Sequence, residues 1–192
     1  ENAACQVTTL IPTTGYCTED FDLWPQFGRC ILVLVMFFGG CAGSTAGGVK
    51  ASRIVLLCKS LRRDLRRVMH SREVRPITLD GHRVTEETVS SVSVFFFAYI
   101  AIMLLGTLIL SLDNIDFTAA FTASLTAISN VGPGLGAVGP TCHFGFLSGI
   151  SKLTMSAIML LGRLEIMPLP ALLMPSVWRR KSKKIHKGGS KF

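Results

Sequence analysis

Charged residues are scarce in this chain of 192 residues. Asp, Glu, Lys and Arg make up 17% of the sequence and hydrophobic residues 49%, and the mean hydropathy is +0.47. Soluble globular domains carry about 25% charged residues. The composition therefore disfavours a soluble domain and indicates a membrane protein.

Lysine and arginine are absent from residues 1–28 and 111–151. Eight of the twenty basic residues lie in residues 59–83 and seven more in residues 179–191. The two stretches without basic residues carry Glu1, Glu19, Asp20, Asp22, Asp113 and Asp116. This alternation follows the positive-inside rule, with the basic segments cytoplasmic and the acidic ones outside. The net charge of +8 therefore does not indicate nucleic-acid binding, which needs basic residues interleaved with aromatics on one face.

The sequence also lacks the residue patterns of common enzyme and cofactor sites. Its six cysteines show no C-x-x-C spacing, and no Ser/His/Asp set, carboxylate pair or metal-ligand cluster is recognisable. Residues 43–50 resemble a phosphate-binding loop, but Ala51 stands where a Ser or Thr must bind magnesium. Residues 134–139 match G-x-G-x-x-G without the strand that should precede it. We therefore expect that the protein is not an enzyme and that this chain holds no cofactor.

A short polar segment at residues 10–16, Leu-Ile-Pro-Thr-Thr-Gly-Tyr, lies among apolar segments. We expect Thr13, Thr14 and Gly15 to keep the backbone extended with its carbonyls on one side, since Gly15 allows φ/ψ values that a β-carbon forbids. Rings of such carbonyls replace the water shell of a dehydrated monovalent cation in channel filters. Residues 1–10 are too short to span a bilayer. They suit a re-entrant pore helix that ends at this run, with an exposed loop as the alternative.

A second segment of the same design follows further along the chain. Residues 116–128 predict a short helix with Asp116 near its N-terminus, where the helix dipole favours a carboxylate. Residues 128–132, Ile-Ser-Asn-Val-Gly, align with residues 11–15, Ile-Pro-Thr-Thr-Gly, at a spacing of 117 residues. An internal repeat of helix, re-entrant loop and helix is a more specific signal than either loop alone.

A glycine-rich loop, residues 39–48, interrupts an apolar helix. The preceding residues 28–38 form an apolar run of eleven residues, about half a membrane crossing. The loop contains five glycines, each of which costs a helix about 1 kcal/mol relative to alanine, and helical character returns from Val49 to about Arg67. A broken helix at membrane depth is tolerated where its backbone lines a cavity or packs in protein. We interpret the glycine-rich loop as an intramembrane gate under the polar run.

The remaining chain alternates between connections and crossings. Residues 68–86 predict a cytoplasmic connection with a turn at Asp80 and Gly81. A helix that opens at residue 85 runs to residue 112 and includes 21 uncharged residues, one full crossing. The last crossing is expected from residue 144 to about residue 173, followed by a basic cytoplasmic tail.

Three charged side chains interrupt this last crossing, namely Lys152, Arg163 and Glu165. Each is costly at membrane depth unless it faces a cavity or a partner. Two interpretations of Arg163 are open at this point. It can pair with a glutamate or with loop carbonyls as structural support. Alternatively, its guanidinium can lie beneath the glycine-rich loop and impede cations while the loop is closed.

Four motifs, taken in order, resemble one family. They are the run ending Thr13-Thr14-Gly15-Tyr16, the glycine-rich loop with Val49 and Lys50, the run Ser129-Asn-Val-Gly-Pro-Gly-Leu135, and Gly162-Arg163-Leu164-Glu165. Together they resemble the Trk/Ktr/HKT potassium transporter family, and within it the bacterial TrkH type. The resemblance implies an all-α membrane protein built from helix–re-entrant pore loop–helix repeats like those of potassium channels. Four such repeats would surround one pore, with a broken helix after the first pore loop of this chain.

The resemblance also implies a C-terminal fragment that begins at the pore helix of the third repeat. Residues 1–67 would end the third repeat, 68–86 form the cytoplasmic linker, 87–178 form the fourth repeat and 179–192 form the basic cytoplasmic tail. The implied selectivity filter, where K+ would bind, consists of Thr13, Thr14, Gly15, Asn130, Val131 and Gly132. The implied gate consists of Gly39, Gly40, Gly43, Ser44, Thr45, Gly47, Gly48 and Arg163. Pro12 departs from the family, which usually has threonine there, and it removes one amide and one hydroxyl from the filter entrance.

The implied function is uptake of K+, with Na+ as a second candidate ion, across the cytoplasmic (inner) membrane of a prokaryote. The implied partners are the lipid bilayer, the missing N-terminal repeats, a second copy in a homodimer and a cytosolic nucleotide-binding regulatory ring of the TrkA/KtrA type. Glycine at the filter position of both repeats favours K+ over Na+, because it permits a carbonyl cage without side-chain intrusion. The alternatives are a broken-helix secondary transporter for another cation or small solute and, from a different class, a membrane enzyme.

Overall fold

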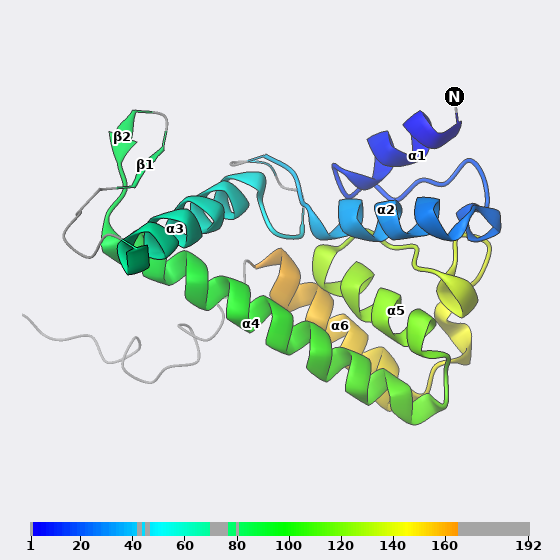
Figure 1. The fold of residues 1–192 in the computed structure, drawn as a ribbon. Coiled ribbons are helices and arrows are strands. Elements are labelled where there is room, and N and C mark those ends of the chain that lie inside the picture. Colours follow the sequence, from blue (N-terminus) through cyan, green and yellow to red (C-terminus); the bar gives the residue numbers. More distant parts are fainter. Residues whose placement is uncertain (1, 42–43, 45–46, 70–76, 80, 165–192) are drawn as a thin grey trace, which may run out of the picture.

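The computed structural model describes residues 2–41, 44, 47–69, 77–79 and 81–164 (Figure 1). Within these residues the regular secondary structure is almost entirely helical, and the one sheet is a two-stranded hairpin. The helices are α1 (Asn2–Leu10), α2 (Gln26–Phe37), α3 (Ala51–Met69), α4 (Glu86–Leu110), α5 (Phe117–Ser129) and α6 (Gly149–Arg163). The hairpin strands are β1 (Thr78–Leu79) and β2 (His82–Arg83). Short 3-10 turns are η1 (Phe21–Leu23), η2 (Ser111–Asp113), η3 (Gly136–Val138) and η4 (Phe144–Phe146).

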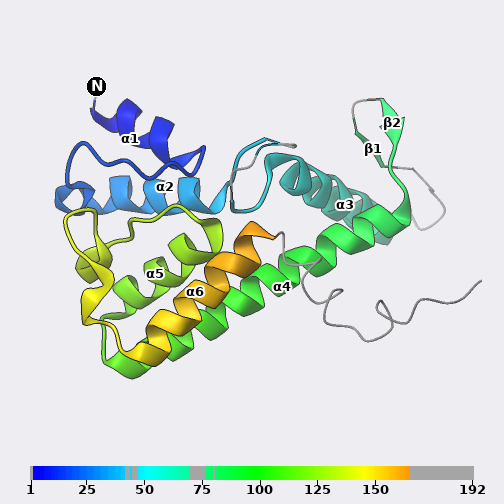
Figure 2. The same ribbon diagram turned by 180° about the vertical axis from the view of Figure 1, so that it is seen from behind.

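The longest helix, α4, runs along most of the molecule, and α3, α5 and α6 pack against it (Figures 1 and 2). Its 25 residues span about 38 Å, enough to cross a hydrocarbon core of about 30 Å. The Thr85 hydroxyl caps it by accepting a hydrogen bond from the Thr88 amide (3.4 Å). Among the described helices, the segment Glu86–Asp113 is long and apolar enough to span a membrane, while α2 and α5 are apolar but shorter. A helix with the length and composition predicted for the central crossing is therefore present.

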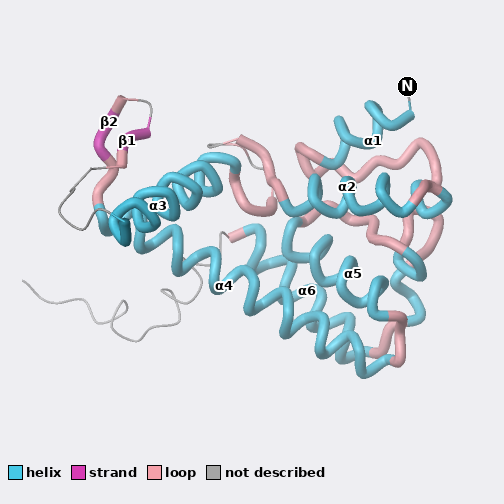
Figure 3. Tube along the Cα trace, viewed as in Figure 1, coloured by secondary structure: helices cyan, strands magenta, loops and turns pink. Residues whose placement is uncertain are grey.

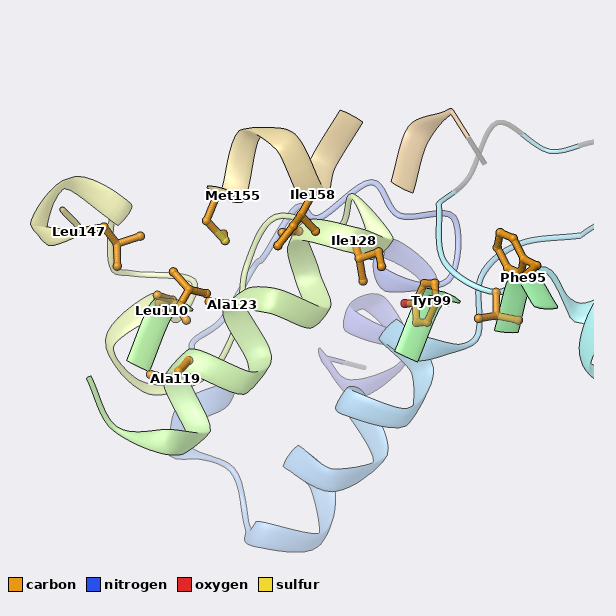
Figure 4. Packing of buried hydrophobic residues seen from close by; sticks show 13 residues of the cluster. Phe95, Tyr99, Leu110, Ala119, Ala123, Ile128, Leu147, Met155 and Ile158 are labelled. Carbon is orange, nitrogen blue, oxygen red and sulfur yellow. The ribbon is translucent and has the colours of Figure 1, made fainter. Parts of the chain in front are cut away.

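Helix α5 lies at the centre of the fold, in contact with α2, α4 and α6. Ten of its thirteen residues are buried, and most of them are Ala, Ser or Thr. Small side chains let neighbouring helices approach closely, and Ser124 Oγ donates a hydrogen bond across the contact to the Met103 carbonyl (2.7 Å). Figure 4 shows the apolar core that the helices share, where Ile128 of α5 lies near Ile158 of α6. The burial of α5 on all sides explains why it has no polar face.

Helices α1 and α2 pack together and reach α5 through a second apolar cluster. The cluster contains Leu10 of α1, Leu32 and Met36 of α2, Leu125 of α5 and Val131 directly after it. The short helices expected at residues 1–10 and 116–128 are both present, as α1 and α5. The C-terminal end of α1 and the C-terminal part of α5 thus belong to the same apolar cluster.

The second half of α3 lies near the hairpin and the start of α4 (Figure 3), and it carries Lys59, Arg62, Arg63, Arg66 and Arg67. Arg63 forms an ion pair with Glu86 in the first turn of α4, and Lys59 donates a hydrogen bond to the Thr78 carbonyl (2.7 Å). Gly81 has a φ of +81° between the two strands, while Asp80, predicted with it as a turn, lies outside the described residues. The predicted connection is thus in part a folded hairpin.

The opposite end of α4 leads into an acidic turn. Asp116 caps α5 by accepting a hydrogen bond from the Thr118 amide (3.2 Å). The Thr118 hydroxyl also donates to this carboxylate, and these bonds hold the pKa of Asp116 below its usual value. The basic second half of α3 and the acidic cap Asp116 are therefore separated along α4 by about the length of a membrane crossing.

The last helix starts later than the crossing predicted over residues 144–173. Helix α6 begins at Gly149, after the turn η4, because Ser148 caps it by accepting a hydrogen bond from the Ser151 amide (3.3 Å). Asp113 holds that cap in place by accepting a hydrogen bond from the Ser148 amide (3.0 Å). The predicted start was wrong by five residues, and the predicted end lies outside the described residues.

Candidate functional site

The two segments that follow the short helices α1 and α5 share a pattern of positive φ angles. We call residues 13–15 the first filter segment and residues 130–132 the second. Each begins with a residue in the left-handed region, Thr13 (φ 58°) and Asn130 (φ 55°). Each ends two residues later with a glycine of positive φ, Gly15 (75°) and Gly132 (115°). The sequence repeat is thus also a repeat of conformation, at the same spacing of 117 residues.

The hydrogen bonds of the two segments repeat in the same register. In each, two successive amides bond back to carbonyls in the last turn of the preceding helix. The pairs are Thr13 N to Leu10 O (3.1 Å) and Thr14 N to Thr9 O (3.0 Å) in the first segment, and Asn130 N to Ala127 O (3.2 Å) and Val131 N to Thr126 O (3.0 Å) in the second. The expectation of an extended backbone was therefore wrong at Thr13, because this left-handed residue closes the end of the helix.

The two filter segments touch each other directly. A β-carbon built on Gly15 would lie 2.1 Å from the Val131 carbonyl oxygen and 3.2 Å from Pro133 Cδ. No side chain fits there, and the φ of +75° at Gly15 excludes most residues independently. A β-carbon on Gly132 would meet nothing within 4 Å. The fold therefore brings Gly15 and Val131 into contact. It leaves open space where a β-carbon of Gly132 would lie.

The glycine-rich loop connects α2 with α3, and hydrogen bonds join its two ends at a base. The Gly39 amide donates to the Val49 carbonyl (3.0 Å), and the Val49 amide donates to the Phe37 carbonyl (3.3 Å). Gly39 and Gly40 are buried at this base, and the Gly40 carbonyl accepts a hydrogen bond from the Ala51 amide (3.2 Å). The expected broken helix is confirmed, with α2 ending at Phe37 and α3 beginning at Ala51.

The far part of this loop lies against the end of α5 and the first filter segment. The Gly47 amide donates a hydrogen bond to Thr13 Oγ1 (3.2 Å). A β-carbon on Gly47 would lie 2.0 Å from the Ser129 carbonyl oxygen, so the loop backbone rests on the last residue of α5. Gly48 follows with a φ of +72°, and Ser44 is exposed. Two further predicted gate residues, Gly43 and Thr45, lie outside the described residues.

Arg163 is the last residue of α6, and this end of α6 packs against the last turn of α5. A β-carbon on Gly162 would lie 2.0 Å from the Ile128 carbonyl oxygen, and Asn130 Nδ2 donates to the Met159 carbonyl (3.2 Å). Arg163 itself is exposed. Its backbone therefore lies within one turn of the place where the glycine-rich loop contacts α5.

This chain matches the family model described as "TrkH: Cation transport protein" over residues 2–179. The chain belongs to the TrkH family. The Trk system potassium uptake protein TrkH of Vibrio parahaemolyticus is 38% identical over 179 residues, which cover 93% of this chain and 36% of that protein. The TrkH of Escherichia coli K12 is 36% identical over 174 residues, with 91% of this chain and 36% of that protein covered.

A solved TrkH structure has the same fold. The crystal structure of the potassium transporter TrkH from Vibrio parahaemolyticus matches with a TM-score of 0.80 and 39% sequence identity. The match covers 91% of this chain and 37% of the crystallised chain. The all-α membrane fold expected from the resemblance is therefore confirmed. This chain spans 36% of the length of the TrkH proteins it matches.

Two polar contacts of this TrkH-family chain were missed in the sequence. Tyr99, buried in α4, shares a hydrogen bond with Ser129 (2.8 Å) at the end of α5, and a lone tyrosine in an apolar helix is a signal that points to such a partner. The Asp22 carboxylate accepts a hydrogen bond from the Gly136 amide, 114 residues away. No local pattern indicates that second contact, because its two residues meet only in the folded chain.

Proposed function

We propose that this chain is the C-terminal part of a potassium uptake protein in the cytoplasmic membrane of a bacterium. The observation that carries the proposal is the contact of the two filter segments, in which Gly15 packs on the Val131 carbonyl. Two backbone segments that repeat in conformation and touch can supply adjacent carbonyls to one dehydrated cation. The named relatives of the family are potassium uptake proteins, which favours K+ over Na+. The proposed ion ligands are backbone groups of Thr13, Thr14, Gly15, Asn130, Val131 and Gly132.

The glycine-rich loop is the proposed gate. Its Gly47 donates to the Thr13 hydroxyl of the first filter segment and rests on the Ser129 carbonyl. A loop in this position lies across the end of α5, on the ion path that the two filter segments would form. Arg163 directly follows Gly162, which packs on the last turn of α5. Its positive charge would therefore repel cations near the glycine-rich loop when this loop is closed.

The proposed assembly extends beyond this chain. The remaining repeats of the same protein would complete the ring of filter segments. They would approach from the side of Gly132, where a β-carbon would meet nothing within 4 Å. A homodimer, and a cytosolic nucleotide-binding ring of the TrkA/KtrA type that controls the gate, are proposed from the family resemblance. The basic residues of α3, including the Arg63 ion pair with Glu86, would then face the cytoplasm.

The filter proposal is tested by Gly15→Ser and Gly132→Ser in the full-length protein. Both substitutions add a side chain to a residue of positive φ, so both should displace the carbonyls beside it. We expect discrimination between K+ and Na+ to fall by about tenfold or more, the scale of about 1.4 kcal/mol of differential binding. The measurement is uptake of each ion by cells that lack other potassium transporters, corrected for the amount of protein in the membrane.

Gly149→Ser is the matched control. A β-carbon on Gly149 would meet nothing within 4 Å, and this residue lies at the start of α6, away from both filter segments. Its ion discrimination should equal that of the unmodified protein. Unchanged discrimination in Gly15→Ser and Gly132→Ser, with normal membrane abundance, would remove the filter assignment.

A further inference from the structure

Besides the contact between the filter segments, a second contact links the two repeats. It is a hydrogen bond between the Asp22 carboxylate and the Gly136 amide. Asp22 lies in the turn η1, and both of its oxygens lie 3.0 Å from the Gly136 amide nitrogen. Gly136 opens the turn η3, which follows the second filter segment. Hydrogen bonds with a charged acceptor are about twice as strong as neutral ones. Within the described residues, Asp22 is thus a charged acceptor that links the loop after the first filter segment to the loop after the second.

The position of this carboxylate is closely determined. Asp22 itself is held in η1, because its amide donates to Asp20 Oδ1 (3.0 Å) and the neighbouring Phe21 is fully buried. On the other side, a β-carbon on Gly139 would lie 2.3 Å from Asp22 Oδ2. The loop of the second repeat therefore closes around the carboxylate and leaves no room for a larger residue at Gly139.

The loop that receives Asp22 is itself tied to α5. The Leu135 amide donates to Thr122 Oγ1 (3.0 Å), and the Gly134 amide donates to the Val138 carbonyl (2.8 Å). Only three residues separate Gly132 of the second filter segment from Gly136. A shift of the Gly136 amide would therefore move the second filter segment relative to the first.

We propose that Asp22 is a positioning residue that fixes the spacing between the two filter segments. The proposal rests on the proposed function, since it concerns the selectivity of the same ion path. The direct contact of Gly15 with the Val131 carbonyl fixes one point of the interface between the repeats, and the contact of Asp22 with Gly136 fixes a second. Two fixed points restrict the rotation of one segment against the other to the axis that joins them. Carbonyl oxygens can then keep a spacing that suits one ion size.

A carboxylate near an ion path has another effect that must be separated from positioning. A negative charge raises the local cation concentration, but it does so equally for K+ and Na+. Glu19 offers the matched control, because it lies in the same loop and is exposed. Its carboxylate accepts a hydrogen bond from the Asn2 side chain (2.9 Å), away from Gly136. Glu19→Gln removes the same charge as Asp22→Asn and leaves the contact with Gly136 intact.

The test compares Asp22→Asn, Gly139→Ala and Glu19→Gln in the full-length protein. Gly139→Ala perturbs the contact from the other side and leaves every charge in place. We expect the K+ over Na+ uptake ratio to fall about threefold in Asp22→Asn, because the amide oxygen of Asn is a weaker, uncharged acceptor for the Gly136 amide. It should fall about tenfold in Gly139→Ala, the scale of one lost hydrogen bond to a charged group, because the added methyl group displaces the carboxylate. Glu19→Gln should change the apparent KM for both ions by the same factor and leave the ratio unchanged.

Each outcome decides the point. An unchanged ratio in both Asp22→Asn and Gly139→Ala overturns the positioning role, and so does an equal loss of ratio in Glu19→Gln. If Asp22→Asn does not reach the membrane, the ratio measured for Gly139→Ala decides alone, and absence of both variants from the membrane assigns Asp22 to folding and overturns the proposal. An unmodified protein that takes up K+ and Na+ equally overturns the proposed function instead.

Discussion

At the scale of single residues, the polar side chains inside the apolar core bond to partners in the chain itself. Tyr99 is 1% exposed, and its hydroxyl lies 2.8 Å from Ser129 Oγ. Its ring packs edge-on against Phe37, the last residue of α2, with ring centroids 5.5 Å apart. One side chain of α4 therefore contacts both the end of α5 and the end of α2, two residues before the glycine-rich loop begins.

The bond between Tyr99 and Ser129 can be measured by a double-mutant cycle. Tyr99→Phe removes one hydroxyl and leaves the Ser129 hydroxyl buried without this partner, which should cost about 1 kcal/mol of stability. Ser129→Ala should cost a similar amount, and the double variant should cost less than the sum of the two, because the shared bond is lost only once. Thermal unfolding of the purified full-length protein in detergent measures each change. Additive losses would mean that the two hydroxyls do not interact.

At the scale of the elements, the sequence predicted the segments whose residues repeat. It did not predict features that depend on contacts between residues far apart in the chain. Residues 11–15 and 128–132 carry similar residues at one spacing, so the two filter segments could be predicted as a pair. The left-handed Thr13 could not, because a β-branched residue rarely adopts positive φ and local pattern favours an extended run. The start of α6 depends on Asp113, 35 residues before Ser148, and no window of neighbouring residues contains that information.

The contact between the glycine-rich loop and the first filter segment predicts how the gate responds to mutation. Thr13→Val keeps the shape of the side chain and removes the hydroxyl that accepts from the Gly47 amide, whereas Thr13→Ser keeps that hydroxyl. The loss of about 1 kcal/mol should shift the loop toward its open arrangement and raise basal Rb+ flux about fivefold in Thr13→Val. Thr13→Ser should leave the flux near that of the unmodified protein.

Arg163→Gln gives an independent check of the same gate. It removes the positive charge at the end of α6 without touching the Thr13 hydroxyl, so it should also raise basal flux, through weaker repulsion of cations. Flux assays in proteoliposomes without any regulatory protein measure both variants under the same gradient. Unaltered flux in Thr13→Val and in Arg163→Gln would remove the proposed gate, while the filter test would stand apart from it.

At the scale of the whole molecule, charge is sorted along the axis of α4. The basic turns of α3 and the ion pair of Arg63 with Glu86 lie at one end, and the acidic cap Asp116 lies beyond the other (Figure 1). No local motif determines this separation of charge. It depends on the length of α4, whose 25 residues hold the basic and the acidic end about 38 Å apart. The positive-inside rule then predicts which end faces the cytoplasm.

Two native cysteines report this orientation. Cys58 in α3 and Cys142 beyond η3 are both exposed and free, and they lie in the basic and in the acidic part of the chain. In full-length variants that keep one cysteine each, a membrane-impermeant maleimide should modify Cys142 in intact spheroplasts and Cys58 only after permeabilisation. A cysteine-free variant gives the background. Labelling of Cys58 from outside, or of Cys142 only after permeabilisation, would reverse the proposed topology. The glycine-rich loop would then lie on the outer side of the filter segments, where a cytosolic regulator could not reach it.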